Sequence, residues 1–332
     1  MKTIAKLTNS ERAIIFNNVA LSFPLKQFAI EKDYWVCFIL DHLFHDSEFH
    51  DLFVFKGGTS LSKAYHVIER FSEDIDLILD WRQFINEDDD PWQERSKNKQ
   101  DKFNKQLNNK ASEFFINKLI PTLTKELATK INDEYHLDID KMDNMVINFY
   151  YPLTFSNEYM RNYIRLEIGP LARWIPSHHE NISPFVCAIY PDKFIQNETS
   201  ILTTDVERTF WEKISILHKI SNFPIDKQLP KRYARHYYDI YMMANSWVKE
   251  KAFERMELLE DIIQFDQKFY YTKSADYSHA TTKEVQLLPS ESIKHQLLLD
   301  YDQMLDMFYG YIPKFSDILS CLKTLQEEIH QL

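Results

Sequence analysis

The chain has 332 residues but only four glycines, and two of these are adjacent, at Gly57 and Gly58. Glycine lets the backbone take unusual conformations or approach another group closely, so a pair in such a glycine-poor chain marks a position where the fold requires it. A short apolar run at 52–55 precedes the pair and is typical of a buried strand. Residues 59–70 are predicted to be helical. The local order is therefore strand, tight turn and helix.

A second predicted strand, at 72–79, carries two carboxylates two residues apart. Alternate residues of a strand share a face, so Asp74 and Asp76 point with Ser72 to one side, while Ile75, Leu77 and Leu79 point to the other. Two neighbouring aspartates repel each other unless a cation lies between them, and Mg²⁺ takes carboxylate oxygens together with substrate phosphates. A solvated strand edge is disfavoured because the opposite face is aliphatic. This arrangement is typical of a nucleotidyltransferase.

Composition narrows the class of protein. Apolar residues make up 44% of the chain and aromatic residues 14%, which is ample for a packed core and argues against disorder. The length allows about two domains. The sequence has no apolar run of about 18 residues, and its first residues lack the apolar segment of a secretory signal. We therefore expect a cytoplasmic protein that has no membrane association.

Metal-binding patterns other than the two aspartates are weak. The three cysteines lie far apart and form no Cys-x-x-Cys pair, which argues against a disulfide framework or a zinc–cysteine site. The histidines at 42, 45 and 178–179 have no third ligand at motif spacing, so we expect them at the surface. The net charge of −11 argues against a general nucleic-acid coat, but it allows one local basic channel.

The remaining pattern predicts an α+β fold with two domains. Residues 10–46 are predicted to be helical, with Ser10 as a cap, and a charged excursion at 81–110 leads into a helix at about 100–130. Further strands are expected at 145–155, 163–168 and 185–190. From about 204 the pattern is helical to the end, and it begins with a capping box at 204–207. We place the domain boundary near 200, which gives domains at 1–200 and 201–332.

Two charged residues outside the aspartate strand are candidates for the site. Glu167 projects from the predicted strand at 163–168 and is a possible third carboxylate, although an ion pair with Arg165 explains it equally well. Lys213 falls within the apolar face of the helix that begins near 204, three residues after Phe210 and four before Leu217. A phosphate or a catalytic aspartate would satisfy this lysine. A lysine at the edge of the stripe that reaches solvent is the ordinary alternative, which the sequence alone favours.

The segment 227–239 combines basic residues with an aspartate. Arg235 and Asp239 stand four residues apart, which is the spacing of a helix salt bridge worth about 0.2–0.5 kcal/mol. The basic residues that lead into this pair, from Lys227 to Arg235, could grip phosphates or RNA. A solvated loop is the preferred reading of these basic residues taken alone.

Taken together, these motifs resemble the AbiEii/AbiGii nucleotidyltransferase toxin family, which includes the MenT-type toxins. The resemblance rests on EKDYW at 31–35, KGGTSLSK at 56–63 and RFSEDIDL at 70–77. It continues through Glu212-Lys213 and the segment 235–241, and more weakly through 300–309. It implies a polymerase-β-like nucleotidyltransferase core and a helical C-terminal domain that closes the active-site cleft.

The resemblance also implies an activity, which is the metal-dependent transfer of a nucleotide from an NTP to an acceptor hydroxyl. The expected cofactor is Mg²⁺ or Mn²⁺, and the expected acceptor is RNA, at the 3′ end of tRNA. The catalytic residues would be Asp74, Asp76, Lys213 and Asp239, and the metal ligands Asp74 and Asp76, with Glu167 less firmly matched. The nucleotide-binding residues would be Gly57, Gly58, Thr59, Ser60, Lys63, Ser72 and Arg235, with Ser72 also at the metal site.

The expected context is a bacterial toxin–antitoxin or phage-defence system with a cognate antitoxin. Two alternatives stay open at this point. One is a protein-nucleotidylating enzyme of the AMPylating type. The other is a non-catalytic nucleotide-binding regulator, against which the paired carboxylates argue. Asp239 could act as a general base or could position Lys213, and the sequence does not separate these roles.

Overall fold

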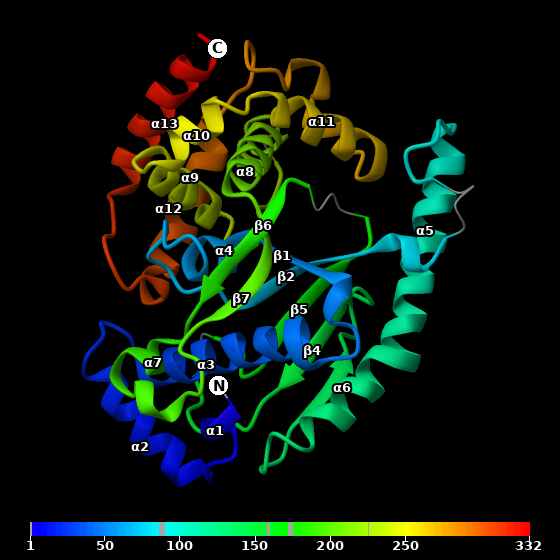
Figure 1. Cartoon of the computed structure of the whole chain (residues 1–332). Coiled ribbons are helices and arrows are strands. Elements are labelled where there is room, and N and C mark those ends of the chain that lie inside the picture. Colours follow the sequence, from blue (N-terminus) through cyan, green and yellow to red (C-terminus); the bar gives the residue numbers. More distant parts are fainter. Residues whose placement is uncertain (1, 86–89, 158–159, 172–174, 225) are drawn as a thin grey trace. The chain divides into compact units, whose positions relative to one another are not determined.

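The computed structural model describes residues 2–85, 90–157, 160–171, 175–224 and 226–332 (Figure 1). The chain forms two compact units. The first, here called the sheet unit, contains residues 1–64 and 71–204. The second, the helical unit, contains residues 205–332 together with the short segment 65–70. Each unit is described by itself.

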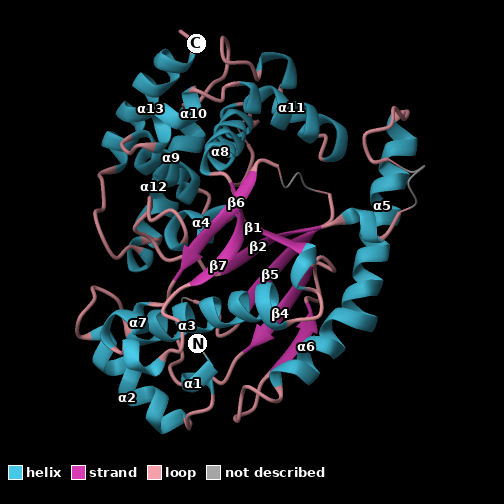
Figure 2. Cartoon of the chain, in the orientation of Figure 1, coloured by secondary structure: helices cyan, strands magenta, loops and turns pink. Residues whose placement is uncertain are grey.

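The sheet unit is built on a seven-stranded mixed sheet with the order β3-β4-β5-β2-β1-β7-β6 (Figure 2). Its strands are β1 (Phe53–Lys56), β2 (Asp74–Leu79), β3 (His136–Ile139), β4 (Val146–Tyr150), β5 (Ile164–Gly169), β6 (Ser177–Ile182) and β7 (Thr199–Thr204). β2 lies at the centre, where it pairs antiparallel with β1 and parallel with β5. The strand that carries the two aspartates is therefore a central strand.

Helices flank this sheet. They are α1 (Lys2–Ala5), α2 (Asn9–Ala20), α3 (Gln27–Asp41), α4 (Gly57–Lys63), α5 (Lys97–Phe114), α6 (Ile120–Leu127) and α7 (Phe185–Ile189). α3 is buried along residues 29–40 and contacts β5, β7 and α7. Its side of the core includes Trp35, which stacks on Tyr151 with ring centroids 5.8 Å apart. α3 is thus the central helix of this unit.

Two buried acidic side chains of α3 each hold a different part of the unit. Glu31 accepts the N–H groups of Thr154 and Phe155, both at 2.8 Å. Asp33 accepts the N–H of Phe185 at 2.8 Å and pairs with Lys63 at 2.7 Å. Because buried charges are costly unless they are paired and hydrogen-bonded, these contacts fix the elements that they join.

The helical unit contains α8 (Val206–Ser221), α9 (Ala234–Ala244), α10 (Val248–Phe253), α11 (Glu257–Phe269), α12 (Glu291–Gln303) and α13 (Phe315–Ile329). α8 packs against α9, α10 and α11, and α9 packs against α12 and α13. In α8 the apolar stripe Phe210, Ile214 and Leu217 is fully buried, as its spacing predicts. Within the described ranges, no helix combines the length and the apolar character that a membrane span needs.

The α+β fold class predicted from the sequence is confirmed, but several local predictions differ from the structure. The helix after the glycine pair ends at Lys63, because residues 65–70 pack with the helical unit instead. Residues 185–189 form α7 and not a strand, and the carboxylate of Asp33 accepts the first N–H of this helix. The strand predicted at 72–79 begins at Asp74.

The predicted helix caps also differ. The cap of α2 is Thr8, which forms a complete capping box with Glu11, and Ser10 lies inside the helix. The capping box predicted at 204–207 is not formed, because the N-cap residue Asp205 makes no side-chain cap hydrogen bond. His42 is buried and lies 2.8 Å from Glu126, so its predicted surface position was wrong. His178 and His179 are exposed, as predicted.

Candidate active site

The glycine turn and the aspartate strand are in direct contact. The register of β1 and β2 places Lys56 opposite Asp76, so the turn at Gly57 lies beside the Asp76 carboxylate. A Cβ atom built on Gly57 would lie only 1.9 Å from Oδ2 of Asp76. Gly57 also has a φ of +81°, in the left-handed region that favours glycine. Both facts explain the glycine here, because the carboxylate occupies the space that a side chain would fill.

The polar side chains that follow the glycine pair hold the turn together. The Thr59 hydroxyl donates to the carbonyl oxygen of Asp74, and the Ser60 hydroxyl donates to the carbonyl oxygen of Gly57 at 2.8 Å. Lys63 is buried, and its Nζ lies 4.4 Å from the centre of the Phe185 ring as well as against Asp33. The predicted nucleotide-binding side chains of Thr59, Ser60 and Lys63 are therefore engaged in the scaffold around the turn.

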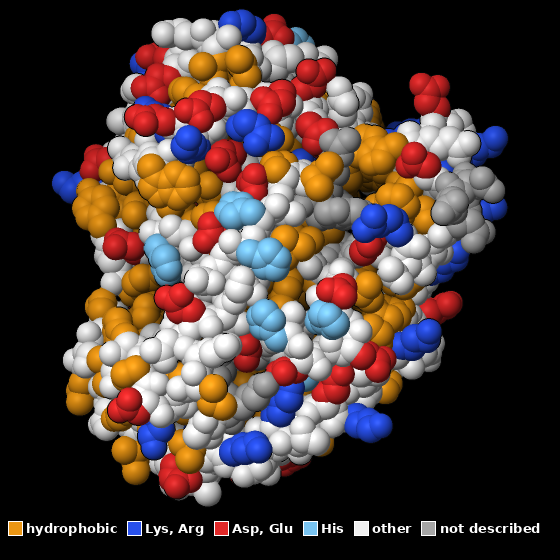
Figure 3. Space-filling view, in the orientation of Figure 1, with side chains coloured by type: hydrophobic (Ala, Val, Ile, Leu, Met, Phe, Trp, Pro, Cys, Tyr) orange, Lys and Arg blue, Asp and Glu red, His pale blue; other side chains and the backbone are white. Residues whose placement is uncertain are grey.

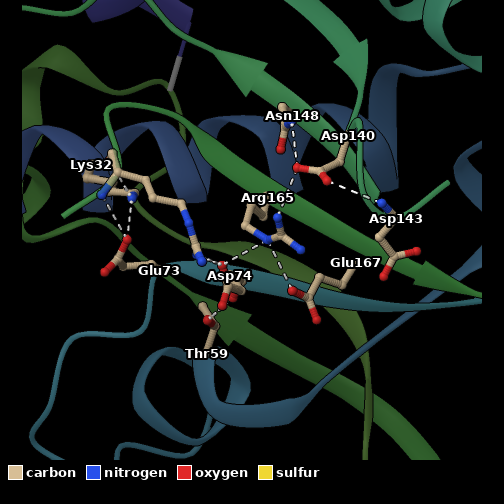
Figure 4. Close-up of polar contacts among 10 residues, drawn as sticks. Lys32, Thr59, Glu73, Asp74, Asp140, Asp143, Asn148, Arg165 and Glu167 are labelled. Atoms are coloured by element: carbon tan, nitrogen blue, oxygen red, sulfur yellow. Dashed lines mark hydrogen bonds and ion pairs between the residues drawn. The ribbon is translucent and has the colours of Figure 1, made fainter. Parts of the chain in front are cut away.

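A third carboxylate lies next to Asp76 across the sheet. The parallel register of β2 and β5 pairs Asp74 with Arg165 and Asp76 with Glu167. Paired residues on neighbouring strands project to the same face, so Glu167 joins Asp74 and Asp76 on the polar face of the sheet. Opposite this face, Ile75 and Leu77 are buried. Figure 4 shows Asp74, Arg165 and Glu167 turned toward one another.

Two arginines contact these carboxylates. Arg161 lies with Nη1 3.2 Å from Oδ1 of Asp74. Arg165 lies with Nε 3.7 Å from the same oxygen and 3.2 Å from Oε1 of Glu167. The ion pair between Glu167 and Arg165, one of the two sequence-based explanations of Glu167, is thus present. It does not exclude the other, because the carboxylate still faces the aspartate side of the sheet.

This donor set fits a divalent cation that is shared with a nucleotide. Carboxylate oxygens are the ligands of a hard cation, and Mg²⁺ is commonly held by one or two carboxylates together with substrate phosphates. The side chains of Asp74 and Glu167 are 18% and 40% exposed, so the site is open to a ligand. Among the described residues, no group of three or more His, Cys, Asp or Glu side chains is placed to hold a metal ion, so Asp74, Asp76 and Glu167 do not form a three-carboxylate site by themselves. The fit is therefore to a partial, carboxylate-only site.

A buried ion pair between Lys32 and Glu73 supports the start of β2. Lys32 of α3 is buried, and its Nζ contacts Oε2 of Glu73 at 3.1 Å and the carbonyl oxygen of Arg161 at 2.8 Å. The N–H of Arg161 donates to the same Glu73 oxygen. Lys32 therefore fixes the residue before Asp74 and the segment that carries Arg161. Sequence reasoning gave neither Lys32 nor Glu73 a role, although both lie in the motifs that it singled out.

The helical unit contains a buried cluster of one aspartate and two cations. The Arg70 guanidinium binds both carboxylate oxygens of Asp239 at 2.7 Å. Nζ of Lys213 contacts Oδ2 of Asp239 at 2.7 Å. The side chains of Arg70, Asp239 and Lys213 are 2%, 0% and 7% exposed. Lys213 thus has an aspartate as its partner and does not reach solvent at the edge of the apolar stripe.

Electrostatics fix the charge states in this cluster. Burial alone would raise the pKa of Asp239, but Arg70 and Lys213 outweigh it and hold this pKa well below its usual range. Burial lowers the pKa of Lys213, an effect that the Asp239 charge partly offsets. A carboxylate held this firmly in its ionised form is a poor proton acceptor. The geometry thus favours a positioning role for Asp239 over a general-base role.

The segment that carries Arg70 is held by the connection between α12 and α13. Residues 308–311 run alongside it, and the N–H of Tyr309 donates to the carbonyl oxygen of Glu69. The N–H of Tyr311 donates to Oε2 of Glu69 at 2.6 Å. A Cβ on Gly310 would lie 2.1 Å from that oxygen, so glycine is required there. Sequence reasoning missed Arg70, although its place next to the aspartate strand was a signal.

The basic segment 227–235, which leads into α9, is held by a residue of α12. Asp300 accepts the N–H groups of Arg232 and Ala234, at 2.5 and 2.8 Å. Lys227 and Lys231 are exposed. Over the face shown in Figure 3, basic and acidic side chains are interspersed. Arg235 is partly exposed, and Asp239 pairs with Arg70 and Lys213, so the simple helix salt bridge is replaced by a buried cluster.

The glycine turn, the aspartate strand and the adjoining carboxylate have the arrangement that the sequence motifs predict for a nucleotidyltransferase. Comparison with known families places the chain within this class. Residues 39–321 match the family described as "Nucleotidyl transferase AbiEii toxin, Type IV TA system". The chain belongs to this family, and it is therefore a nucleotidyltransferase that uses an NTP as substrate. The resemblance inferred from the motifs is confirmed.

Solved structures with similar architecture were also found. JHP933 from Helicobacter pylori is 16% identical with a TM-score of 0.45, covering 92% of this chain and 94% of that one. A putative nucleotidyltransferase from H. pylori is 15% identical with a TM-score of 0.44, covering 92% and 96%. MenT4, a nucleotidyltransferase toxin from Mycobacterium tuberculosis, is 14% identical with a TM-score of 0.43, covering 98% and 97%. No curated protein matches the sequence significantly.

Proposed function

We propose that this protein is the toxin of a bacterial toxin–antitoxin system and transfers a nucleotide from an NTP to a hydroxyl of RNA, at the 3′ end of tRNA. The acceptor oxygen forms a bond to the α-phosphorus while the bond from the α-phosphorus to the bridging oxygen breaks. Pyrophosphate leaves with that oxygen, and the proton of the acceptor hydroxyl passes to solvent. The observation that carries the proposal is the contact between Gly57 and Asp76 beside Asp74 and Glu167.

The carboxylates of Asp74 and Asp76 would hold Mg²⁺ or Mn²⁺, and Glu167, which is paired with Arg165, is the less firmly matched third carboxylate beside them. When bound, the cation supplies charge stabilisation for the attacking and leaving oxygens. The main chain of the turn at 57–59 lies beside Asp76 and is assigned to the phosphates. Ser72, just before β2, is assigned to the same ligand. Thr59, Ser60 and Lys63 keep the turn in shape through their side chains.

Lys213 is assigned to the negative charge that develops on the phosphates, and Arg235 to an anionic part of the substrates. Asp239 holds Lys213 in place and Arg70 holds Asp239, so both are assigned as positioning residues. We also propose that residues 201–332 act as a domain that closes over the nucleotide.

An RNA acceptor is supported by the exposed basic residues Lys227 and Lys231 in a chain of net charge −11. Phosphate contacts from such residues position an RNA without reading its sequence. Membership of a toxin family supports a cognate antitoxin as a further partner. We propose a cytoplasmic location, because NTP and RNA are intracellular. We propose a role in phage defence on the basis of the toxin family.

The experiment that tests this proposal uses purified protein, total RNA and total protein from a bacterial lysate. Each NTP, labelled at the α-phosphate, is added in turn with Mg²⁺, and the RNA and protein fractions are separated. Label in tRNA, lost in Asp76→Asn, is the expected result. Label in the protein fraction would establish the AMPylating-type alternative instead. Absence of label in both fractions with every NTP would overturn the proposal.

A further inference from the structure

Arg165 lies between two groups of acidic side chains. Its Nε faces Asp74 and Glu167, at 3.7 and 3.2 Å, while its Nη1 lies 3.1 Å from Oδ2 of Asp140 (Figure 4). Only 16% of the side chain is exposed. One guanidinium therefore bridges the proposed metal ligands and a carboxylate that belongs to the loop after β3.

Asp140 is itself held rigidly. Its Oδ1 accepts the N–H groups of Met142 and Asp143, at 2.9 and 3.2 Å, and its Oδ2 accepts Nδ2 of Asn148 at 3.2 Å. These hydrogen bonds, led by that of Met142, lower the pKa of Asp140 and keep it ionised. Asp140 is therefore a fixed anchor for one end of Arg165, and its side chain is 14% exposed, against 40% for Glu167.

The charges on this face make Arg165 a competitor of a divalent cation. Asp74, Asp76 and Glu167 carry three negative charges on one face, and Arg161, Arg165 and Lys56, which the register places opposite Asp76, bring three positive charges to that face. A guanidinium that contacts a carboxylate competes with a divalent cation for the same oxygens and repels the cation over a few ångströms. A polyphosphate that arrives with the cation offers the guanidinium a new anionic partner, since arginine matches phosphate geometry.

We propose that Arg165 couples metal binding to nucleotide binding. It neutralises Asp74 and Glu167 when no nucleotide is bound, and it turns to the nucleotide phosphates when cation and nucleotide bind together, with Asp140 as its fixed anchor. Arg165 is thus a specificity-determining residue, because it weakens the binding of a cation that arrives without a nucleotide. This inference rests on the proposed metal site at Asp74 and Asp76. By linkage, the nucleotide raises the affinity for the cation by the same factor as the cation raises the affinity for the nucleotide.

The test measures binding and not turnover. The probes are Mn²⁺ alone, followed by electron paramagnetic resonance, and inorganic tripolyphosphate at saturating Mn²⁺, followed by calorimetry. In Arg165→Gln, removal of the positive charge should tighten the Kd for Mn²⁺ alone about tenfold and weaken the Kd for tripolyphosphate about tenfold. Asp140→Asn frees the guanidinium to rest on Asp74 and Glu167, so it should weaken Mn²⁺ binding severalfold.

Arg82→Gln is the matched control, because it also removes one arginine charge from the sheet unit. Arg82 is 63% exposed, pairs with Asp80 and lies beyond the far end of β2 from Asp74. This variant should leave both dissociation constants within about twofold of the wild-type values. Thermal unfolding of all variants shows whether each is folded at the assay temperature.

The outcomes separate this inference from the proposed function. If Asp76→Asn still binds Mn²⁺ like the wild type, the metal site itself is misplaced and both fail. If Asp76→Asn loses Mn²⁺ but Arg165→Gln binds it like the wild type, the coupling alone is wrong. Weaker Mn²⁺ binding in Arg165→Gln would also overturn the inference, because Arg165 would then orient the carboxylates instead of competing for them.

Discussion

Replacement of Asp239 by asparagine should destabilise the protein far more than replacement of Lys213. Asp239 is the carboxylate that both buried cations share, because it contacts Arg70 and Lys213 through three contacts of 2.7 Å. Asp239→Asn removes the negative charge that both buried cations contact. Breaking one buried pair typically costs about 3–5 kcal/mol, so we expect a loss of about 4 kcal/mol or more in the free energy of unfolding.

Lys213→Met makes the opposite change. It keeps the side-chain length on the apolar face of α8 and leaves the bidentate pair of Arg70 and Asp239 intact and neutral overall. Replacing a buried charge by an apolar residue of similar volume is often close to neutral. We therefore expect Lys213→Met to stay within about 1 kcal/mol of the wild type and to lose catalysis.

The assay is equilibrium unfolding in urea, with thermal unfolding as a second readout. The expected loss in Asp239→Asn corresponds to a drop of roughly 10–20 °C in Tm for a unit of this size. Because Lys213→Met removes one of the two cations that contact Asp239, the double variant should regain part of the stability that Asp239→Asn loses. A loss below about 1 kcal/mol in Asp239→Asn, or no coupling between the two changes, would refute the reasoning.

Three further predictions concern other parts of the chain. Gly57→Ala should abolish nucleotide transfer and weaken Mn²⁺ binding, because the new Cβ would lie 1.9 Å from Oδ2 of Asp76. The check is the Kd for Mn²⁺, measured by calorimetry on variant protein whose thermal unfolding shows that it is folded. Burial raises the pKa of Glu31 to about 7 against the opposing pull of the Phe155 and Thr154 hydrogen bonds. The folded protein thus binds more protons than the unfolded chain between about pH 4.5 and 7. Stability should fall as pH rises through this window, by about 3 kcal/mol, and Glu31→Gln should lack this slope in urea titrations at each pH. Charge reversal at Lys227 and Lys231 should weaken RNA binding and flatten its dependence on salt, and an unchanged salt slope would make this segment an ordinary solvated loop.

Much of the site could be predicted because its signals are local. The glycine pair, the two aspartates and the alternation along β2 lie within some twenty residues, and strand geometry alone puts the carboxylates on one face. Glu167 required one more step, the parallel register of β2 and β5. That register depends on the pairing of two strands that are far apart in the chain, and a local sequence pattern does not predict such a pairing.

The partners of buried charges were the harder part. Arg70 and Asp239 lie 169 positions apart, and so the sequence offered Arg235, four residues away, as the obvious partner of Asp239. The role of Lys32 was hidden for the same reason, because Glu73 is distant in the chain. The helix at 185–189 was misread as a strand because its apolar run is short, and such runs do not distinguish the two structures.

Transfer of the α-phosphate label is the measurement that tests the central claim most directly. Protein, tRNA and Mg²⁺ are incubated with an NTP labelled either at the α-phosphate or at the γ-phosphate, for the wild type and for Asp76→Asn. The α label should become bound to RNA, the γ label should appear only in pyrophosphate, and Asp76→Asn should lose both products while its Tm stays close to that of the wild type. Transfer of the γ label to an acceptor, or full activity in folded Asp76→Asn, would contradict the account.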